Sequence, residues 1–172
     1  LVAQAAAMIN AAERPLLYLG GGIVHSGASA QAVELAEKAS LPTVMTLMAL
    51  GGMPVDHPLS LGMLGMHGAR CTNFALDECD LLIAVGARFD DRATGKVAAF
   101  CPQAKIIHID IDPSELDKIK TAHIGIQGDV AAVLAQLAPQ VKANLRETWL
   151  GRIAELKTAH PLRMPGIDDP RT

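Results

Sequence analysis

The segment that spans residues 81–92 constrains the fold of this chain more than any other. It opens with five consecutive apolar residues, continues through Gly86, and places four charges within residues 88–92. A strand that is apolar at every position is typical of a parallel sheet covered by helices on both faces, and ligands of such sheets bind beyond the carboxyl ends of the strands. The segment therefore predicts either a ligand-binding edge or a solvated loop whose charges pair with one another, formed by Arg88, Asp90, Asp91 and Arg92.

The rest of the chain alternates between apolar strands and helical patterns. Strands are predicted at residues 16–19, 43–47, 81–85, 105–112 and 123–127, and helices at 3–12, 28–39, 69–78 and 94–100, with a helical turn at 113–116 and a last helix that begins at 128–129 and carries Trp149. Such an alternation favours a doubly wound α/β fold. We expect a mainly parallel, Rossmann-like sheet of about five or six strands flanked by helices.

Three local features refine this pattern. Ser26 or Ser29 is placed to cap the helix at 28–39. Residues 49–68 are rich in Gly, Met, Pro and His and predict a long loop, a kind of segment that is usually functional or mobile. Asp110 and Asp112 are expected to share one face of their strand because they are two residues apart.

Length and composition limit the functions available. The 172 residues suit one domain, which we expect at residues 1–160, with 161–172 as a linker or tail and both ends cut from a longer polypeptide. A formal charge of -3 without a Lys/Arg cluster argues against nucleic-acid binding. No apolar run approaches the roughly 18 residues of a membrane span, and the irregular cysteine spacing suits reduced thiols. These features favour a cytoplasmic protein, or an organellar one whose leader has been removed.

Gly20, Gly21 and Gly22 follow a predicted strand and precede a helical pattern. Small residues in such a turn let backbone N–H groups approach a phosphate, although a plain tight turn would look the same. The dinucleotide pattern G-x-G-x-x-G is incomplete because His25 stands in place of the third glycine. The end of the next strand, around Thr46, also lacks an acid for a ribose hydroxyl, so an ordinary NAD dehydrogenase is disfavoured.

The remaining polar candidates favour binding over chemical reaction. His67 could act as a base, but it lies between Gly and Met residues without an adjacent carboxylate, which favours packing on a ligand or on the core. His108 alternates with apolar neighbours and is expected to be structural. Asp110 and Asp129 end predicted strands and could accept hydrogen bonds from ribose or an adenine amino group, while Asp129 could equally cap a helix. The histidines have no metal-ligand spacing, and no nucleophile has an evident base.

Five segments, taken in order and spacing, resemble the central domain of the acetohydroxyacid (acetolactate) synthase large-subunit family: Leu17 to Gly22, Thr46 to Gly51, Met63 to Gly68, Gly86 to Arg92 and Gly128-Asp129. Members of that family condense two 2-ketoacids on thiamine diphosphate and also bind FAD. The resemblance implies FAD contacts at Gly20, Gly21, Gly22, Thr46, Leu47, Leu64, Gly65, Met66, His67, Gly86, Arg88, Asp90, Arg92, Asp110, Ile111, Gly128 and Asp129. It also implies that Asp91 faces the substrate channel.

The same resemblance implies what this chain lacks. In that family the thiamine-activating glutamate and the Gly-Asp-Gly metal motif belong to flanking domains. This chain has neither, since Gly128-Asp129 is followed by Val130. Thiamine diphosphate, Mg²⁺, a second large subunit and a regulatory subunit are therefore partners of the parent enzyme, and the excised domain should be catalytically silent. A structural module without a ligand and an NAD- or ADP-binding domain remain the alternatives.

Overall fold

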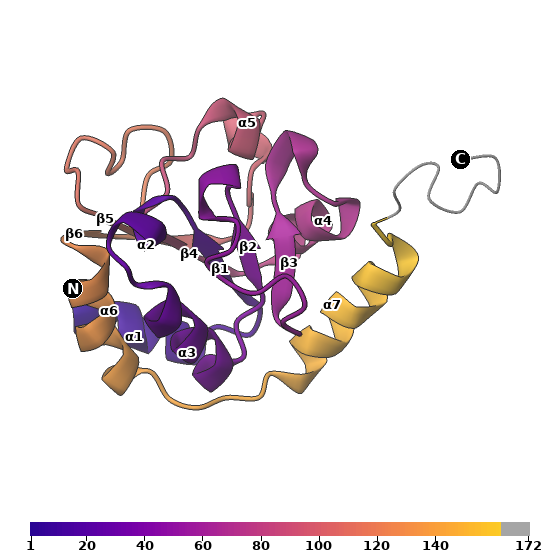
Figure 1. Cartoon of the computed structure of the whole chain (residues 1–172), viewed down its shortest axis with the longest axis horizontal. Coiled ribbons are helices and arrows are strands. Elements are labelled where there is room, and N and C mark those ends of the chain that lie inside the picture. Colours follow the sequence, from indigo (N-terminus) through magenta and orange to yellow (C-terminus); the bar gives the residue numbers. More distant parts are fainter. Residues whose placement is uncertain (163–172) are drawn as a thin grey trace.

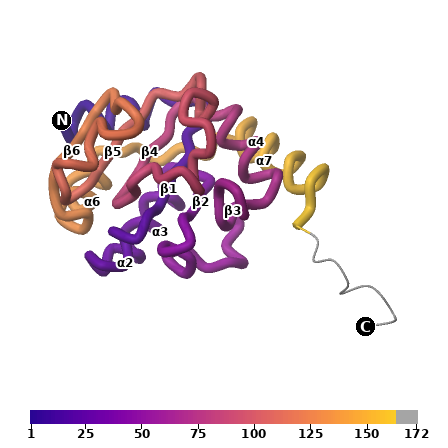
Figure 2. The backbone as a smooth tube through the Cα atoms, turned by 90° about the horizontal axis from the view of Figure 1, so that it is seen from above, coloured from indigo at the N-terminus to yellow at the C-terminus, as the bar shows by residue number. Residues whose placement is uncertain are grey.

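A computed structural model describes residues 1–162 of the chain as a six-stranded parallel sheet with helices on both faces (Figure 1). The strand order is β3-β2-β1-β4-β5-β6, which Figure 2 shows from one side of the molecule to the other. The strands are β1 (Pro15–Leu19), β2 (Thr43–Met45), β3 (Ser60–Met63), β4 (Leu81–Val85), β5 (Lys105–Asp110) and β6 (Ile124–Gln127). The expected doubly wound fold class is confirmed.

Helices form the two outer layers. They are α1 (Val2–Ala11), α2 (Gly22–His25), α3 (Ser29–Ala39), α4 (Arg70–Glu78), α5 (Asp91–Thr94), α6 (Val130–Leu137) and α7 (Glu147–Ala159), with short 3-10 turns η1 (Leu47–Ala49), η2 (Gly65–His67), η3 (Val97–Ala99) and η4 (Ala138–Gln140). Apolar residues of α1, α3 and α6 pack on one face of the sheet, and those of α4 and α7 pack on the other. No helix in the described part of the chain is long and apolar enough to span a membrane.

Strand β4 explains why the sheet needs both layers. Its side chains alternate, so Leu81, Ile83 and Val85 join the core under α1, α3 and α6, whereas Leu82 and Ala84 join the core under α4 and α7. All five residues are at most 1% exposed. A strand with one wet face would carry polar residues at alternate positions, so the uninterrupted apolar run is the sequence signature of this central position.

The chain changes direction between β1 and β4. From β1 it continues outward to β2 and β3, and it then returns to place β4 on the other side of β1, with Leu17 opposite Ile83. The loops after β1 and β4 therefore leave the sheet side by side and then diverge. In open α/β sheets, this topological switch point is where ligands bind.

Several element boundaries differ from the predictions. Strand β3 lies inside the predicted loop 49–68, and β5 ends at Asp110, so Asp112 lies beyond the strand and does not share a strand face with Asp110. Residues 113–116 form a turn, as predicted, but the helix predicted at 94–100 is wrong, because α5 ends at Thr94 and only the 3-10 turn η3 follows. Trp149 lies on the separate helix α7. Ala28 precedes α3 without a side-chain cap, because Ser26 bonds Ile23 O instead. The end of the predicted tail, residues 163–172, lies outside the described residues.

Helix α7 is attached to the amino edge of the sheet, opposite the strand ends that carry the switch point. The Arg146 guanidinium donates to the carbonyls of Ile9, Ala12 and Ala39, at the ends of α1 and α3. Figure 1 shows the segment between α6 and α7 running below α3 to reach this position. A buried cation at two helix C-termini satisfies carbonyls that the helices leave free and interacts favourably with their dipoles.

Candidate functional site

Every strand delivers residues predicted to bind the cofactor to the same edge of the sheet. They are Gly20, Gly21 and Gly22 after β1, Thr46 and Leu47 after β2, Leu64, Gly65, Met66 and His67 after β3, Gly86, Arg88, Asp90 and Arg92 after β4, Asp110 and Ile111 at the end of β5, and Gly128 and Asp129 after β6. They share this edge because all six strands are parallel. Segments separated by more than 100 residues along the chain thus contribute to one surface.

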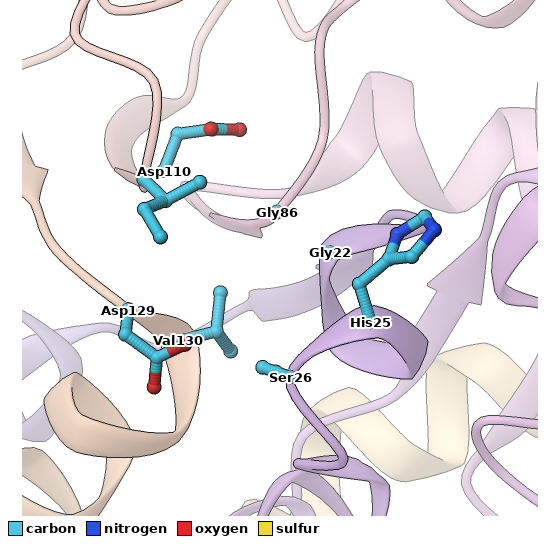
Figure 3. Close-up of a pocket in the computed structure, with 8 residues that line it drawn as sticks. Gly22, His25, Ser26, Gly86, Asp110, Asp129 and Val130 are labelled. Carbon is cyan, nitrogen blue, oxygen red and sulfur yellow. The ribbon is translucent and has the colours of Figure 1, made fainter.

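A pocket of about 280 Å³ opens at the switch point, between the loops that follow β1, β4, β5 and β6 (Figure 3). It is lined by Gly22, His25, Ser26, Gly86, Asp110, Ile111, Asp129 and Val130. The sequence prediction missed His25, Ser26 and Val130 as lining residues. Their position in the sequence could have indicated them, because they lie close to the predicted Gly-rich turn or directly after Asp129.

The glycines after β1 are needed for close contact between two backbones. A Cβ on Gly20 would overlap the Gly86 carbonyl, and one on Gly22 would come within 2.7 Å of the Gly86 Cα. The N–H groups of Gly20 and Gly22 already donate to Val85 O and Gly86 O, at 2.9 and 3.1 Å. The tight-turn interpretation therefore accounts for Gly20 and Gly22. Gly21 differs, because its N–H donates to neither Val85 nor Gly86.

The charged loop after β4 is held by one aromatic side chain. Phe89 is 2% exposed and has a left-handed backbone with φ of 55°, while Arg88 and Asp90 on either side are exposed. Asp90 Oδ1 caps α5 by accepting from Ala93 N–H at 3.0 Å. All four charged residues of the loop are exposed, as the predicted solvated loop requires, but the predicted pairing of the charges is wrong, since no ion pair in the described structure joins any two of them.

Two acidic residues line the pocket at the ends of neighbouring strands. Asp110 is 7% exposed, and its Oδ1 accepts from the Asp112 N–H at 2.9 Å. Asp129 Oδ1 accepts from the Ala132 N–H at 3.0 Å, which confirms the predicted helix cap. Each carboxylate has a second oxygen that could accept a hydrogen bond from a ligand hydroxyl or amino group.

Exposed apolar side chains also lie along this edge, both in the pocket and outside it. Leu47, Met66 and Ile111 are 69%, 72% and 65% exposed. His67 is exposed as well, so the predicted packing on the core is wrong and packing on a ligand stays a prediction, whereas Leu64 is buried. The Thr46 hydroxyl is buried and has no hydrogen-bond partner in the described structure. This edge therefore combines carboxylates, a cation, exposed apolar surface and one unsatisfied hydroxyl.

The described residues hold no evident centre for metal or thiol chemistry. No group of three or more His, Cys, Asp or Glu side chains among residues 1–162 could hold a metal ion. Cys71, Cys79 and Cys101 are free and buried, in agreement with the predicted reduced thiols. A hydrogen bond with the neighbouring Cys79, together with burial, raises the pKa of Cys101, which keeps its thiol protonated and unreactive.

The sheet, its switch point and the polar groups at the strand ends define a Rossmann-like, doubly wound α/β domain. The family model described as "Thiamine pyrophosphate enzyme, central domain" matches residues 2–137. The chain belongs to this family, in agreement with the resemblance seen in its motifs.

Individual relatives sharpen the comparison. The chain is 61% identical over 169 residues to the acetolactate synthase isozyme 1 large subunit of Escherichia coli (strain K12), which covers 98% of this chain and 30% of the relative. It is 50% identical over 170 residues to the probable acetolactate synthase large subunit of Methanocaldococcus jannaschii, covering 97% and 28%. The isozyme 2 large subunit of Escherichia coli is 45% identical over 163 residues, covering 94% and 29%. The chain thus spans less than a third of the length of these relatives.

Proposed function

We propose that residues 1–160 are the FAD-binding central domain of an acetolactate synthase large subunit. The parent enzyme would condense two pyruvates, or pyruvate with 2-ketobutyrate, in branched-chain amino-acid biosynthesis, in the cytoplasm or in an organelle. The names and identities of the relatives support the enzyme. FAD binding is supported mainly by one observation: all six strands end at the same edge of the sheet, and the residues there suit a flavin dinucleotide.

The side chains at this edge match the parts of FAD. Arg88 is an exposed cation two residues after Gly86, which lines the pocket, and it would hold the diphosphate, because a guanidinium supplies several donors to a diffuse anion. Asp110 and Asp129 would accept hydrogen bonds from ribose hydroxyls or the adenine amino group. Leu47 and Met66 offer exposed apolar surface to a flat ring, and the unpartnered Thr46 hydroxyl provides a polar contact. The flavin performs no net redox in this family, so its contribution would be to the architecture of the active site.

The chain itself would be non-catalytic. Its role would be to bind and orient the cofactor and to present Asp91 to a substrate channel completed by other domains. Thiamine diphosphate and Mg²⁺ would bind to those flanking domains, and a second large subunit and a regulatory subunit would complete the enzyme. The exposed Leu47, Met66 and Ile111 are consistent with an edge that other parts of the enzyme or the cofactor cover.

Titration of the chain with FAD, followed by flavin fluorescence and melting temperature, tests the proposal. We expect saturable FAD binding, weaker binding of ADP because it lacks the flavin half, and no stabilisation by NAD. Stabilisation by NAD but not by FAD would favour the dinucleotide-binding alternative. The absence of any response would favour a structural module, an alternative supported by the two glycine N–H groups that the chain already uses internally.

A further inference from the structure

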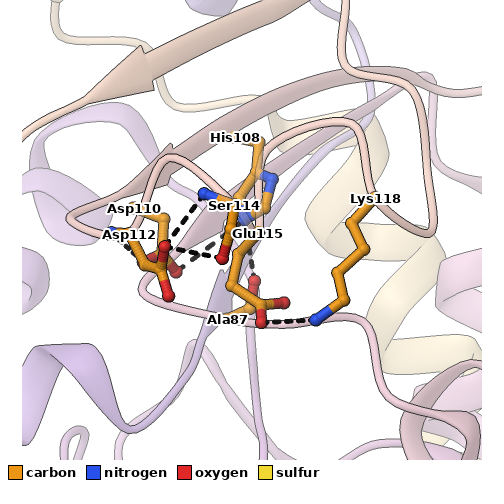
Figure 4. Close-up of polar contacts among 7 residues, drawn as sticks. All are labelled: Ala87, His108, Asp110, Asp112, Ser114, Glu115 and Lys118. Atoms are coloured by element: carbon orange, nitrogen blue, oxygen red, sulfur yellow. Dashed lines mark hydrogen bonds and ion pairs between the residues drawn. The ribbon is translucent and has the colours of Figure 1, made fainter.

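His108 lies directly beneath the charged loop, buried in the sheet face that α4 and α7 cover. It is opposite Ala84 of β4, which is in turn opposite Tyr18 of β1. Its Nε2 lies 2.8 Å from the Ala87 carbonyl oxygen, and the side chain is 0% exposed (Figure 4). A carbonyl can only accept, so this hydrogen bond assigns the proton to Nε2.

The imidazole contacts the loop on both sides of Arg88. Its hydrogen bond fixes the carbonyl of the preceding residue, and its ring packs against the following residue, Phe89, with centroids 5.0 Å apart and planes at 87°. Phe89 also packs edge-on against Tyr18 at 5.6 Å. A left-handed phenylalanine is strained and persists only where its surroundings hold it. His108 therefore acts on the backbone that carries the exposed guanidinium.

Packing alone does not explain a histidine at this position. Its Nδ1 is buried without a partner, and burial lowers the pKa of the imidazole despite the nearby Asp110. An apolar residue would avoid both the unsatisfied nitrogen and the cost of burying a titratable group. What it would not provide is the donor to the Ala87 carbonyl.

We propose that His108 is a positioning residue for Arg88, and that it sets the affinity of this edge for a dinucleotide diphosphate by fixing the loop at Ala87 and Phe89. The inference rests on the proposed function, because the diphosphate is the group that Arg88 would meet. His108 itself does not contact the ligand. It acts by removing conformational freedom that the loop would otherwise lose on binding.

Two substitutions separate the hydrogen bond from the volume. His108→Leu removes the donor, and His108→Gln keeps an N–H that can reach a carbonyl. Tyr18→Phe is the matched control, because it preserves the ring against Phe89 and removes a hydroxyl that has no partner in the described structure. Dissociation constants for FAD and ADP are measured by calorimetry well below each melting temperature, and amide hydrogen exchange is measured across residues 87–93.

We expect His108→Leu to weaken both ligands about tenfold and to speed exchange in the loop, since one net hydrogen bond corresponds to about that factor. His108→Gln should recover most of the affinity, and Tyr18→Phe should change neither readout. With Arg88→Ala already present, His108→Leu should have little further effect, because a positioning residue has nothing left to position.

An equal loss from His108→Leu with and without Arg88 would overturn the inference and indicate a general structural role. Unchanged affinity and exchange in His108→Leu would overturn it as well. If the unsubstituted chain binds neither ligand, the proposed function fails, and loop exchange then decides alone: faster exchange in His108→Leu supports the positioning role, and unchanged exchange overturns it.

Discussion

The two edges of the sheet differ in whether their polar groups have partners within the chain. At the amino edge, the chain satisfies its own groups: Arg146 bonds three helix-end carbonyls, Asp80 accepts from the N–H groups of Glu13 and Arg14 at 2.8 and 2.9 Å, and Trp149 Nε1 donates to Pro15 O at 3.0 Å. These contacts join segments from both ends of the sequence. They make this edge the part of the molecule that holds the layers together.

The carboxyl edge is left incomplete. Arg88 and Asp91 are exposed without ion-pair partners in the described structure, the Thr46 hydroxyl has no hydrogen bond, and Leu47 and Met66 are open to solvent. Groups that are satisfied internally contribute to stability, whereas groups left open are available to a ligand at a cost to stability. The comparison thus predicts large stability effects at the amino edge and ligand effects at the carboxyl edge.

The largest effect is expected from Arg146→Ala. It would leave the carbonyls of Ala12 and Ala39 without the guanidinium donor and the Ile9 carbonyl with only the Ala12 N–H at 3.4 Å. Each unsatisfied group costs about 1–3 kcal/mol, so we expect a loss of about 2–5 kcal/mol. Arg146→Lys should recover little, because one ammonium cannot match the three directions of a guanidinium. Urea unfolding measures both. A loss below about 1 kcal/mol would contradict the assigned role of this edge.

Gly20→Ala tests whether substitutions at the carboxyl edge can also have a large effect on stability. The new Cβ would overlap the Gly86 backbone, which cannot move away as a flexible side chain could, so we expect a loss of about 1–3 kcal/mol from a carboxyl-edge position. Gly21→Ala is the matched control, because its Cβ would come no closer than 3.2 Å to the side chain of Met48. Equal midpoints of urea unfolding for the two variants would show that the backbone contact is not needed.

The sequence predicted what depends on local pattern. The uninterrupted apolar run of β4 indicated a sheet covered on both faces. Residues at or just after strand ends, such as Asp110 and Asp129, lie at the pocket because all the strands are parallel and end at one edge. The reason for the glycines could not be predicted, since it depends on the backbone of Gly86, far along the chain.

Long-range contacts also explain the missed strand. Strand β3 has only four residues in a segment rich in Gly and Pro, and local propensity there favours a loop. It is held from outside: Thr72 Oγ1 donates to Leu61 O at 2.6 Å, and Lys157 Nζ donates to Ser60 O at 3.0 Å. Side chains of α4 and α7 thereby stabilise an edge strand, which no pattern within residues 49–68 could reveal.

A smaller, pH-dependent effect is expected from His108, which belongs to the carboxyl edge but is buried. Burial lowers the pKa of His108 and outweighs the hydrogen bond to Ala87 and the charges of Asp110, Asp117 and Glu115, which raise it. Protonation therefore favours the unfolded chain. Stability should be full above pH 6.5, the ordinary value, and should fall as the pH drops below it, by at most about 1.4 kcal/mol per pH unit. The difference between the unsubstituted chain and His108→Gln isolates this contribution. Parallel pH profiles would show that His108 does not titrate in this window.

The smallest effects on stability are expected from substitution of two exposed arginines, Arg88 and Arg152. Arg88→Ala should change the free energy of unfolding by no more than about 0.5 kcal/mol, because Arg88 has no ion-pair partner in the described structure. Arg152→Ala removes contacts to Glu78 and Glu155 at 2.7 and 3.0 Å, but both ion pairs are solvent-exposed, so the loss of stability should also be small.

The two variants should differ in FAD affinity. Arg88→Ala should weaken binding about tenfold or more at low salt, with a smaller effect at high ionic strength because an exposed cation is screened. Arg152→Ala should leave binding unchanged, because its partners lie on α4 and α7, away from the pocket. Calorimetric titration at two salt concentrations gives both numbers. If the two substitutions weakened FAD binding equally, the affinity would depend on overall charge. The carboxyl edge would then not be the ligand-binding side of this sheet.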